Sequence, residues 1–261
     1  FLMKKMKTIE GEVPQYYVEH SHEAIINPTE WDMVQAEIAR RKTLGRAYSG
    51  NSVFSSKLVC GDCGGFFGPK VWHSADTYRK TIWRCNSKFN GEKKCATPHL
   101  DAETIQRKFL IAYSRLMGNR DTIVSDCEFM RQTLSDCTAL DTEIDGLTEE
   151  ITVVAELVKT CIKENASTAQ SQENYTKKYN ALVKRYEKAT KRADELNAER
   201  TCKQDRDREL RLFIESIKEH PLVLEEWNER LWVGLLEKAT IFRDGRMVFE
   251  FKNGTEIEVE R

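Results

Sequence analysis

The stretch from Cys60 to Cys95 decides the fold. It begins Cys60-Gly-Asp-Cys63-Gly-Gly, passes through a basic and aromatic run, and ends with Cys85 and Cys95. Two cysteines three positions apart and followed by glycine form a tight turn that directs both sulfurs at one metal ion. Two further cysteines within about 35 residues complete a tetrahedral thiolate set, for which zinc is the default ion. The spacing therefore predicts one structural zinc ion per chain, held by Cys60, Cys63, Cys85 and Cys95.

The third and fourth ligands are less closely defined, because nine residues separate Cys85 from Cys95 and this pair forms no tight knuckle. His73 or His99 could replace one of these cysteines in the ligand set. Four buried thiols or two disulfides are the alternatives to a metal site. The sequence shows no signal peptide and no membrane-spanning apolar run, which favours a reducing compartment and disfavours disulfides. The other cysteines lie singly in predicted helices: Cys127, Cys137, Cys161 and Cys202.

Charge is distributed unevenly along the 261 residues, although the formal net charge is only −1. Residues 40–100 contain twelve Lys and Arg against three Asp and Glu, a net charge of +9. Residues 101–261 have a net charge of −6, and residues 1–39 have one of −4. A basic block flanked by acidic segments predicts a localised contact with a polyanion. Because the first residue is Phe1, we expect the chain to be a fragment of a longer protein.

Aromatic residues are interleaved with the cations of this basic block, a combination typical of surfaces that bind nucleic acid. A small hydrophobic core explains Phe66 and Trp83, and a solvated face is the simpler explanation for the cations. Seven cations on so short a module nevertheless favour contact with DNA phosphates. The candidate DNA-binding residues are Arg40, Arg41, Lys42, Arg46, Lys70, Arg79, Lys80, Arg84, Lys88, Lys93 and Lys94.

A helix is predicted from Asn27-Pro28, because asparagine caps a helix and proline suits its first turn. Trp31, Val34 and Ile38 recur at helical spacing and form the apolar face of this helix. The helix runs out at Arg40-Arg41-Lys42, where the cations also interact favourably with the helix dipole.

Residues 43–57 are rich in Gly, Ser and Asn and show no hydrophobic period, which predicts a flexible linker. Arg46 lies within this segment, and a basic linker between two folded parts can follow a DNA groove. A plain linker without any DNA contact is the simpler interpretation of the same residues.

The clearest periodicity in the chain predicts a helical hairpin. After a first arm, a polar tip at residues 163–174 turns the chain back, and the second arm must run antiparallel to the first. Two helices inside a globular bundle are the alternative, which we reject because the other faces are almost entirely charged and polar. The predicted seam consists of Leu140, Ile144, Leu147, Ile151, Val154, Val158 and Cys161, then Tyr175, Tyr179, Leu182, Tyr186, Ala189, Ala193 and Leu196.

Three short strands close the chain after two apolar helices. The strands are separated by Asp244-Gly245 and Asn253-Gly254, which are typical hairpin turns and therefore predict a β-meander. The predicted fold class is α+β. It combines a small zinc β-ribbon, flanking helices and the C-terminal meander with a long antiparallel coiled-coil hairpin inserted between its helices.

This order of parts resembles the C-terminal half of a large serine recombinase, the type of enzyme that integrates phages and transposons in bacteria. Four segments carry the resemblance, and their order is more specific than any one of them. Residues 19–35 resemble the end of the recombinase domain, residues 58–65 with Cys85 and Cys95 the zinc ribbon, and residues 241–257 the closing β-hairpin. The heptad hairpin resembles the coiled coil that is inserted in this family.

The resemblance implies a division into parts. Residues 1–42 would be the end of the recombinase domain and residues 43–57 the linker. Residues 58–135 and 210–261 would be the two portions of the zinc ribbon domain, and residues 136–209 the inserted coiled coil. The family's catalytic domain, with its nucleophilic serine, has no match here, so no catalytic residue is assigned and the chain is not expected to cut DNA by itself.

The resemblance also implies partners. The ribbon would contact the major groove of a double-stranded attachment site, and the linker would follow the groove. The coiled coil would hold recombinase subunits together as dimers or tetramers across synapsed sites and control the direction of reaction, together with a recombination directionality factor. The expected location is the bacterial cytoplasm, in association with the nucleoid.

Two other functions fit the same features. A zinc-ribbon adaptor of another nucleic-acid machine, such as a polymerase or a primase, would share the basic ribbon. A coiled-coil interaction protein would use the zinc site only as a staple. The coding sequence upstream distinguishes the first alternative, because only a serine recombinase would have a catalytic domain there. Charge reversal at Lys80 and Arg84 distinguishes the second, because it would leave partner binding intact.

Overall fold

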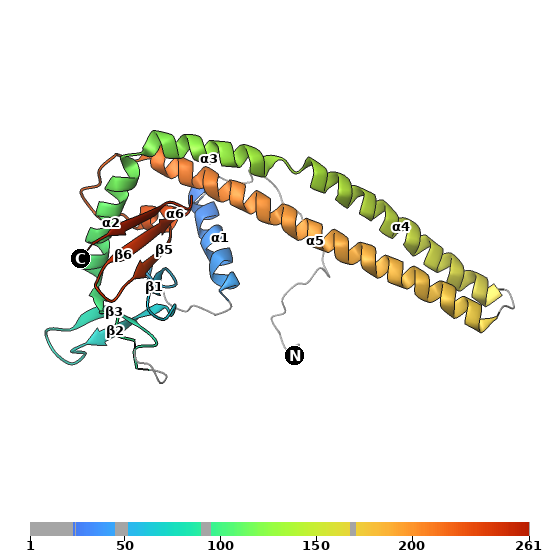
Figure 1. Cartoon of the computed structure of the whole chain (residues 1–261), viewed down its shortest axis with the longest axis horizontal. Coiled ribbons are helices and arrows are strands. Elements are labelled where there is room, and N and C mark those ends of the chain that lie inside the picture. Colours follow the sequence, from blue (N-terminus) through green and yellow to red (C-terminus); the bar gives the residue numbers. More distant parts are fainter. Residues whose placement is uncertain (1–22, 24, 45–51, 90–94, 168–170, 261) are drawn as a thin grey trace, which may run out of the picture.

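The computed structural model describes residues 23, 25–44, 52–89, 95–167 and 171–260 of the chain. It is a mixed α+β structure with six helices and seven strands among these residues. Two small sheets and several helices form a body, and two long helices extend from one side of it as a hairpin (Figure 1). The predicted fold class is therefore confirmed.

The larger sheet joins the strand that leads into the first cysteine pair to the C-terminal strands of the chain. Strand β1 (Leu58–Cys60) pairs in parallel with β5 (Leu236–Ile241), which continues into the antiparallel strands β6 (Met247–Phe251) and β7 (Glu256–Val259). The last three strands are the predicted meander, and both of its turns contain a glycine with positive φ. The strand that leads into the first cysteine pair is thus fixed by residues far away in the sequence.

The smaller sheet contains Cys85, the first cysteine of the second pair. It consists of β2 (Phe67–Trp72), β3 (Lys80–Cys85) and the short β4 (Leu100–Asp101), all antiparallel. Asp101 ends β4 and also caps the next helix by accepting a hydrogen bond from the backbone N–H of Thr104. The ribbon is therefore continuous with the helical part of the body.

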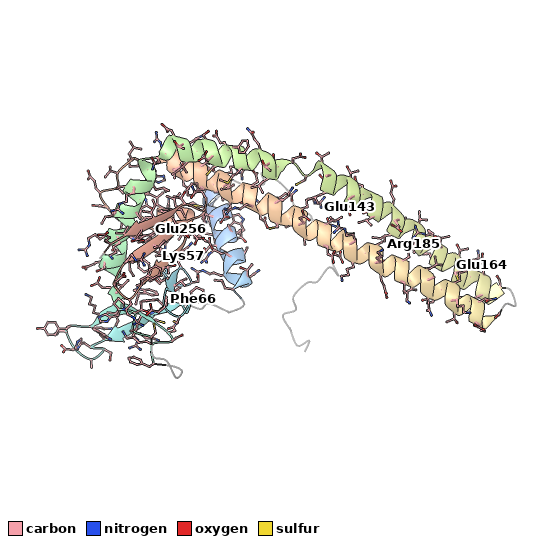
Figure 2. The ribbon with its side chains drawn as sticks, in the orientation of Figure 1. Lys57, Phe66, Glu143, Glu164, Arg185 and Glu256 are labelled. Atoms are coloured by element: carbon pink, nitrogen blue, oxygen red, sulfur yellow. The ribbon has the colours of Figure 1, made fainter. Side chains whose placement is uncertain are left out.

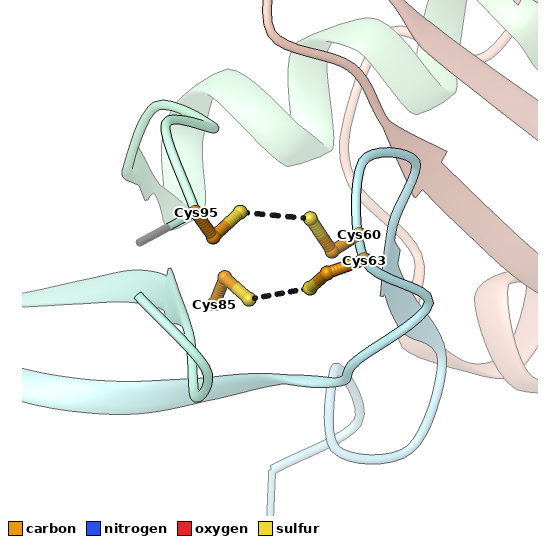
Figure 3. Close-up of side chains that lie close together, drawn as sticks. All are labelled: Cys60, Cys63, Cys85 and Cys95. Atoms are coloured by element: carbon orange, nitrogen blue, oxygen red, sulfur yellow. Dashed lines mark hydrogen bonds between the residues drawn. The ribbon is translucent and has the colours of Figure 1, made fainter. Parts of the chain in front are cut away.

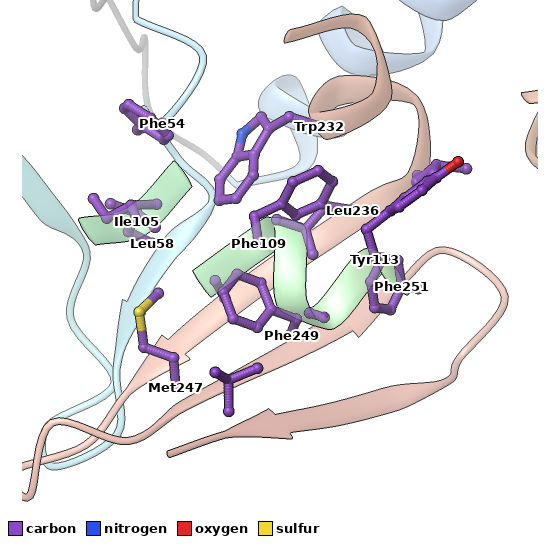
Figure 4. Packing of buried hydrophobic residues seen from close by; sticks show 14 of the residues in the cluster. Phe54, Leu58, Ile105, Phe109, Tyr113, Trp232, Leu236, Met247, Phe249 and Phe251 are labelled. Carbon is purple, nitrogen blue, oxygen red and sulfur yellow. The ribbon is translucent and has the colours of Figure 1, made fainter. Parts of the chain in front are cut away.

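The hydrophobic core lies between the larger sheet and helices α2 (Ala102–Met117) and α6 (Glu229–Leu235). Phe109 is at its centre, with its ring in edge contact with Trp232 at 5.2 Å and near Phe249 at 6.2 Å (Figure 4). The Trp232 indole N–H donates to the backbone carbonyl of Val53, so this buried polar atom is satisfied. The core thus ties residues before the cysteines to the C-terminal helix and sheet.

The hairpin consists of α4 (Thr138–Ser167) and α5 (Gln172–Glu219), and α3 (Arg120–Ser135) lies along the base of α5 (Figure 1). Helix α5 runs without a break from the hairpin into the body, so the boundary suggested at residue 209 falls inside one helix. The tip is also shorter than residues 163–174, because both helices extend into that range. The hairpin is therefore joined to the body by continuous helix.

Helix α1 (Pro28–Thr43) begins and ends where the sequence predicts, but its apolar face is not covered. Its apolar residues Trp31, Val34 and Ile38 remain 53%, 51% and 42% exposed. A different side of the helix faces the body, where the guanidinium of Arg40 donates to the hydroxyl of Ser56 at 2.8 Å. A stripe of apolar residues identifies a helix face but does not show what covers it, and within the described residues this face stays largely exposed.

Part of the predicted linker is also packed against the body. Phe54 lies in the core against Trp83 and Trp232, and Lys57 is completely buried. The ammonium of Lys57 donates to the backbone carbonyl of Leu236 at 2.5 Å and lies 3.5 Å from the Glu37 carboxylate. Residues 52–57 are therefore part of the folded unit, whereas Arg46 lies outside the described residues.

Candidate metal centre and nucleic-acid surface

The first cysteine pair sits in a tight turn at the end of β1. The backbone N–H of Cys60 donates to the carbonyl of Gly65 at 2.8 Å, and the N–H of Gly64 donates to the carbonyl of Cys60 at 2.8 Å. Gly64 has a φ of 69°, a conformation that favours glycine. An added Cβ at Gly65 would lie 2.9 Å from the hydroxyl of Ser87, so that side chain would have to move. The turn thus favours glycine at Gly64 through its backbone conformation and leaves little space at Gly65.

The second pair is brought to the same point from two separate segments. Cys85 ends β3, and Cys95 follows residues 90–94, which are outside the described part of the chain. All four sulfurs lie within 4.8 Å of one another. The Sγ atoms of Cys60 and Cys95 are 3.3 Å apart, and those of Cys63 and Cys85 are 3.4 Å apart. Dashed lines in Figure 3 mark both distances.

This spacing suits one tetrahedral metal ion. Four sulfurs at about 2.3 Å from a central zinc ion would be separated by roughly 3.8 Å. The sulfur–sulfur distances of 3.3 and 3.4 Å are slightly shorter than that value, and all four sulfurs lie within 4.8 Å, so small shifts would accommodate an ion. Within the described residues, the cluster contains the four cysteines and no histidine. His99 packs its ring against Trp72 at 4.3 Å instead, and His73 lies in the exposed β2–β3 connection.

A fully buried threonine supports the cluster. The hydroxyl oxygen of Thr97 lies 2.8 Å from the sulfur of Cys60 and 2.8 Å from that of Cys95. The backbone carbonyl of Thr97 accepts a hydrogen bond from the ammonium of Lys88 at 3.0 Å. Sequence reasoning missed Thr97, and its position two residues after Cys95 is the only local signal that could have suggested it. This hydroxyl is placed to donate to a metal-bound thiolate.

The acidities of the thiols follow from these contacts. Burial raises the pKa of Cys60 and that of Cys85, since the uncharged thiol is favoured away from water. Burial acts in the same direction on Cys95, but hydrogen bonds from the Thr97 hydroxyl and backbone N–H outweigh it and lower the Cys95 pKa to about 7. Without a cation, the raised pKa values keep Cys60 and Cys85 protonated. A bound metal ion would be needed to keep all four cysteines as thiolates.

Several of the candidate DNA-binding cations already have partners inside the molecule. Arg40 and Arg41 both bind the carboxylate of Glu37, which explains why they occupy the inner side of α1. Lys80 forms an ion pair with Asp101 at 2.8 Å. These three cations therefore contribute to the fold in addition to any external contact.

The remaining candidates differ in exposure. Arg79 and Lys42 are exposed, and Lys70 is half-buried. Arg84 lies with its guanidinium 4.6 Å from the centre of the exposed Phe89 ring, a cation–π arrangement on the ribbon surface. The structure does not describe Lys93 and Lys94. Arg79 is therefore exposed to an anionic ligand, whereas Lys70 and Arg84 are only half-exposed and the Nε atom of Arg84 is buried.

The predicted seam residues lie along the contact between α4 and α5. Ile144, Val154 and Leu196 are buried, and most of the others are buried or half-buried. Tyr186 is 38% exposed, so its ring lies at the margin of the seam. Tyr175 and Tyr179 stack with their ring centres 5.8 Å apart near the tip.

Residues 53–113 match the family model of the recombinase zinc beta ribbon domain. This segment begins just before Phe54 and contains the whole cysteine cluster and most of α2. No curated protein and no solved structure is significantly similar to the chain. No helix in the described part of the chain is long and apolar enough to cross a membrane. The four cysteines are thus positioned to bind a metal ion within a recombinase zinc ribbon region.

Proposed function

Starting from this recombinase zinc ribbon region, we propose that the chain is the DNA-binding and subunit-interaction portion of a large serine recombinase. The observation that carries the proposal is the match at residues 53–113 together with the four converging sulfurs. The recombinase acts in the bacterial cytoplasm on the DNA of a mobile element. Cleavage belongs to a serine catalytic domain elsewhere in the protein, and no residue of this chain performs it.

One zinc ion per chain holds the ribbon in shape. The ligands are Cys60, Cys63, Cys85 and Cys95, and four thiolates leave no open position for water, so the ion is structural. The ion joins the end of β1 to the end of β3, and β1 in turn is paired with β5. The zinc ion therefore fixes the orientation of the smaller sheet relative to the body.

The ribbon binds double-stranded DNA through the cations on its smaller sheet. Lys70, Arg79 and Arg84 contact phosphates or base edges, and Lys80 can add a contact from its position beside Asp101. Arg40 and Arg41 take less part in DNA binding, because their guanidinium groups are held by Glu37. Residues 45–51, with Arg46, connect α1 to the ribbon and follow the DNA groove.

The helical hairpin links recombinase subunits during synapsis. Most of its length projects beyond the body (Figure 1), which leaves its surfaces open to another subunit or to a directionality factor. Residues 1–42 belong to the end of the recombinase domain. The hairpin divides the zinc ribbon domain into two portions, which the pairing of β1 with β5 brings together.

The experiment that tests DNA binding compares two double variants with equal charge loss. Lys70→Met/Arg79→Met removes two ribbon cations, and Lys184→Met/Lys188→Met removes two exposed cations from α5. A duplex selected by the zinc-loaded chain from a randomised pool serves as the probe. We expect only the ribbon variant to weaken binding, with the slope of log affinity against log salt falling by about 1 for each lost phosphate contact. If both double variants had the same DNA affinity and the same salt dependence, the proposed DNA-binding surface would be contradicted.

A further inference from the structure

The turn between β5 and β6, at residues 242–246, packs against the turn that carries the first cysteine pair. We call them the β5–β6 turn and, for residues 60–65, the knuckle. The backbone N–H of Gly61 donates to the carbonyl of the last residue of β5 at 2.8 Å. The guanidinium of Arg243 donates to the carboxylate of Asp62 at 3.1 Å. Both residues between the two cysteines are therefore held by the C-terminal part of the chain.

The ring of Phe242 explains why the residue after the first cysteine is glycine. A Cβ added at Gly61 would lie 2.6 Å from the Cδ1 atom and 2.7 Å from the Cε1 atom of Phe242. These distances are shorter than Cβ atoms normally make, so any larger residue would displace the ring or the knuckle. The ring thus lies directly against the backbone that connects two metal ligands.

The β5–β6 turn is itself anchored to two other elements. The N–H of Phe242 donates to the carbonyl of Arg246 at 3.0 Å, and the guanidinium of Arg246 lies 4.3 Å from the centre of the Phe242 ring. Arg246 also binds the carboxylate of Glu258 on β7 at 2.7 Å. The ammonium of Lys108, buried on α2, donates to the carbonyl of Gly245 at 2.7 Å. The turn therefore connects the knuckle to both α2 and the meander.

The shape of the knuckle bears directly on metal binding. Backbone hydrogen bonds from Asp62 and Cys63 reach the sulfur of Cys60, and such bonds stabilise a metal-bound thiolate. Cys63 is exposed, whereas the other three cysteines of the cluster are buried. The position of Cys63 therefore depends on how the knuckle is held rather than on packing around its own side chain.

The β5–β6 turn is remote from the cysteines in the sequence. Between them the chain passes to the tip of the hairpin, near Glu164, and returns, whereas Phe66, just after the first cysteine pair, lies in the body (Figure 2). The family model at residues 53–113 includes all four cysteines but ends well before the β5–β6 turn. The ligands are thus supported by a segment outside the recognisable ribbon.

We propose that the β5–β6 turn positions the first cysteine pair for zinc, with Phe242 and Arg243 acting on the ligands through the knuckle. The inference rests on the zinc ion of the proposed function and goes beyond it, because it makes metal retention depend on the C-terminal meander. Contacts that orient metal ligands commonly change metal affinity about 10- to 100-fold. An exposed ion pair contributes less, so the larger effect is expected from Phe242.

A double-mutant cycle between Gly61 and Phe242 tests the ring contact. Gly61→Ala places a methyl group against the ring and should weaken zinc retention about 10-fold in competition with a chelator. Gly61 has no positive φ, so alanine brings no backbone strain of its own. Phe242→Ala should also weaken retention, because the knuckle loses its support. Adding Gly61→Ala to Phe242→Ala should then cost little more, since the methyl group meets no ring.

Arg243→Met tests the ion pair, with Arg230→Met as its control. The two arginine side chains are 70% and 74% exposed, and Arg230 binds Glu30 at 2.7 Å in an ion pair that joins α6 to α1. We expect Arg243→Met to weaken zinc retention about two- to fivefold, and Arg230→Met to leave it unchanged. Arg243→Lys keeps the charge and should restore most of the loss. Because Arg243 is largely exposed, this test holds even if Phe242→Ala unfolds the turn.

Cobalt bound in place of zinc reports the coordination, because its absorption spectrum depends on the ligands and their geometry. The variants should keep a tetrahedral thiolate spectrum while they release the metal more readily, and circular dichroism checks their fold. A wild type that binds neither metal would refute both the proposed zinc ion and the inference. Equal metal retention by wild type, Phe242→Ala and Arg243→Met would overturn the inference alone. An equal penalty for Gly61→Ala with and without the Phe242 ring would also overturn it.

Discussion

Thr97 connects the metal centre to the rest of the ribbon at the scale of single residues. Its hydroxyl contacts two of the four sulfurs, and its carbonyl is held by Lys88. A hydroxyl that donates to a metal-bound thiolate spreads the negative charge of the site, and such supporting contacts commonly change metal affinity about 10- to 100-fold. Thr97 therefore belongs to the metal site although it is not a ligand.

Thr97→Val keeps the shape of the side chain and removes the hydrogen bond. We expect it to weaken zinc retention about 10-fold or more in competition with a chelator, and to speed alkylation of the released thiols. Thr97→Ser retains the hydroxyl and should behave almost like the wild type. Equal zinc retention by the Thr97→Val variant and the wild type would show that the contact only fills space.

Lys57 makes stability depend on pH. Burial lowers its pKa from 10.5 to about 7, even though the nearby Glu37 carboxylate acts in the opposite direction. In the unfolded chain the ammonium keeps its ordinary pKa, so between about pH 7 and pH 10 the unfolded state binds more protons than the folded state. The contribution of Lys57 to the free energy of unfolding therefore increases with pH between about pH 7 and pH 10. Below about pH 7 it no longer depends on pH.

Lys57→Met removes this titration. The stability of the wild type relative to the variant should increase from pH 7 to pH 9, by at most about 1.4 kcal/mol for each pH unit. Thermal melting at several pH values measures the difference. Lys238→Met is the control, because Lys238 lies on β5, whose neighbouring residue Ala239 donates to the backbone carbonyl of Lys57, and its hydrogen-bonded ion pair with Glu250 raises its pKa. If the melting temperatures of the wild type and Lys57→Met changed in parallel with pH, the lowered pKa of Lys57 would be contradicted.

At the scale of elements, local patterns predict the structure correctly where the partner lies nearby in sequence. The heptads of the hairpin and the Asp-Gly and Asn-Gly turns of the meander specify elements that meet their sequence neighbours. Helix α5 is harder to delimit, because its polar stretch around residues 197–209 carries no apolar stripe. There the helix is supported by α3, through contacts such as the ion pair between Arg131 and Asp207 at 2.8 Å.

Contacts between distant segments could not be predicted from the sequence. Nothing in residues 58–60 indicates that they pair with residues 239–241, since pairing depends on the path of the whole chain. Helix α1 shows the same limit, because its amphipathic sequence does not reveal that Glu37 and Arg40 face the body. Composition assigns Lys57 and Ser56 to a linker, although their side chains contact these two residues.

At the scale of the whole molecule, the two proposed functions would share one scaffold. The ribbon presents cations near the metal centre, and α5 links the body to the hairpin as a single helix of 48 residues. A continuous helix transmits orientation better than a flexible joint would. If the hairpin contacts another subunit as proposed, α5 would set the direction of that contact relative to DNA bound by the ribbon.

Zinc content and DNA binding, measured on the same samples before and after chelation, test the central claim most directly. We predict one zinc ion per chain and preferential binding of a duplex selected from a randomised pool over a scrambled duplex. Chelation should abolish that preference, and added zinc should restore it, while the helix content of the hairpin stays largely unchanged. A chain that holds no zinc, or that keeps its DNA preference after the metal is removed, would contradict the account.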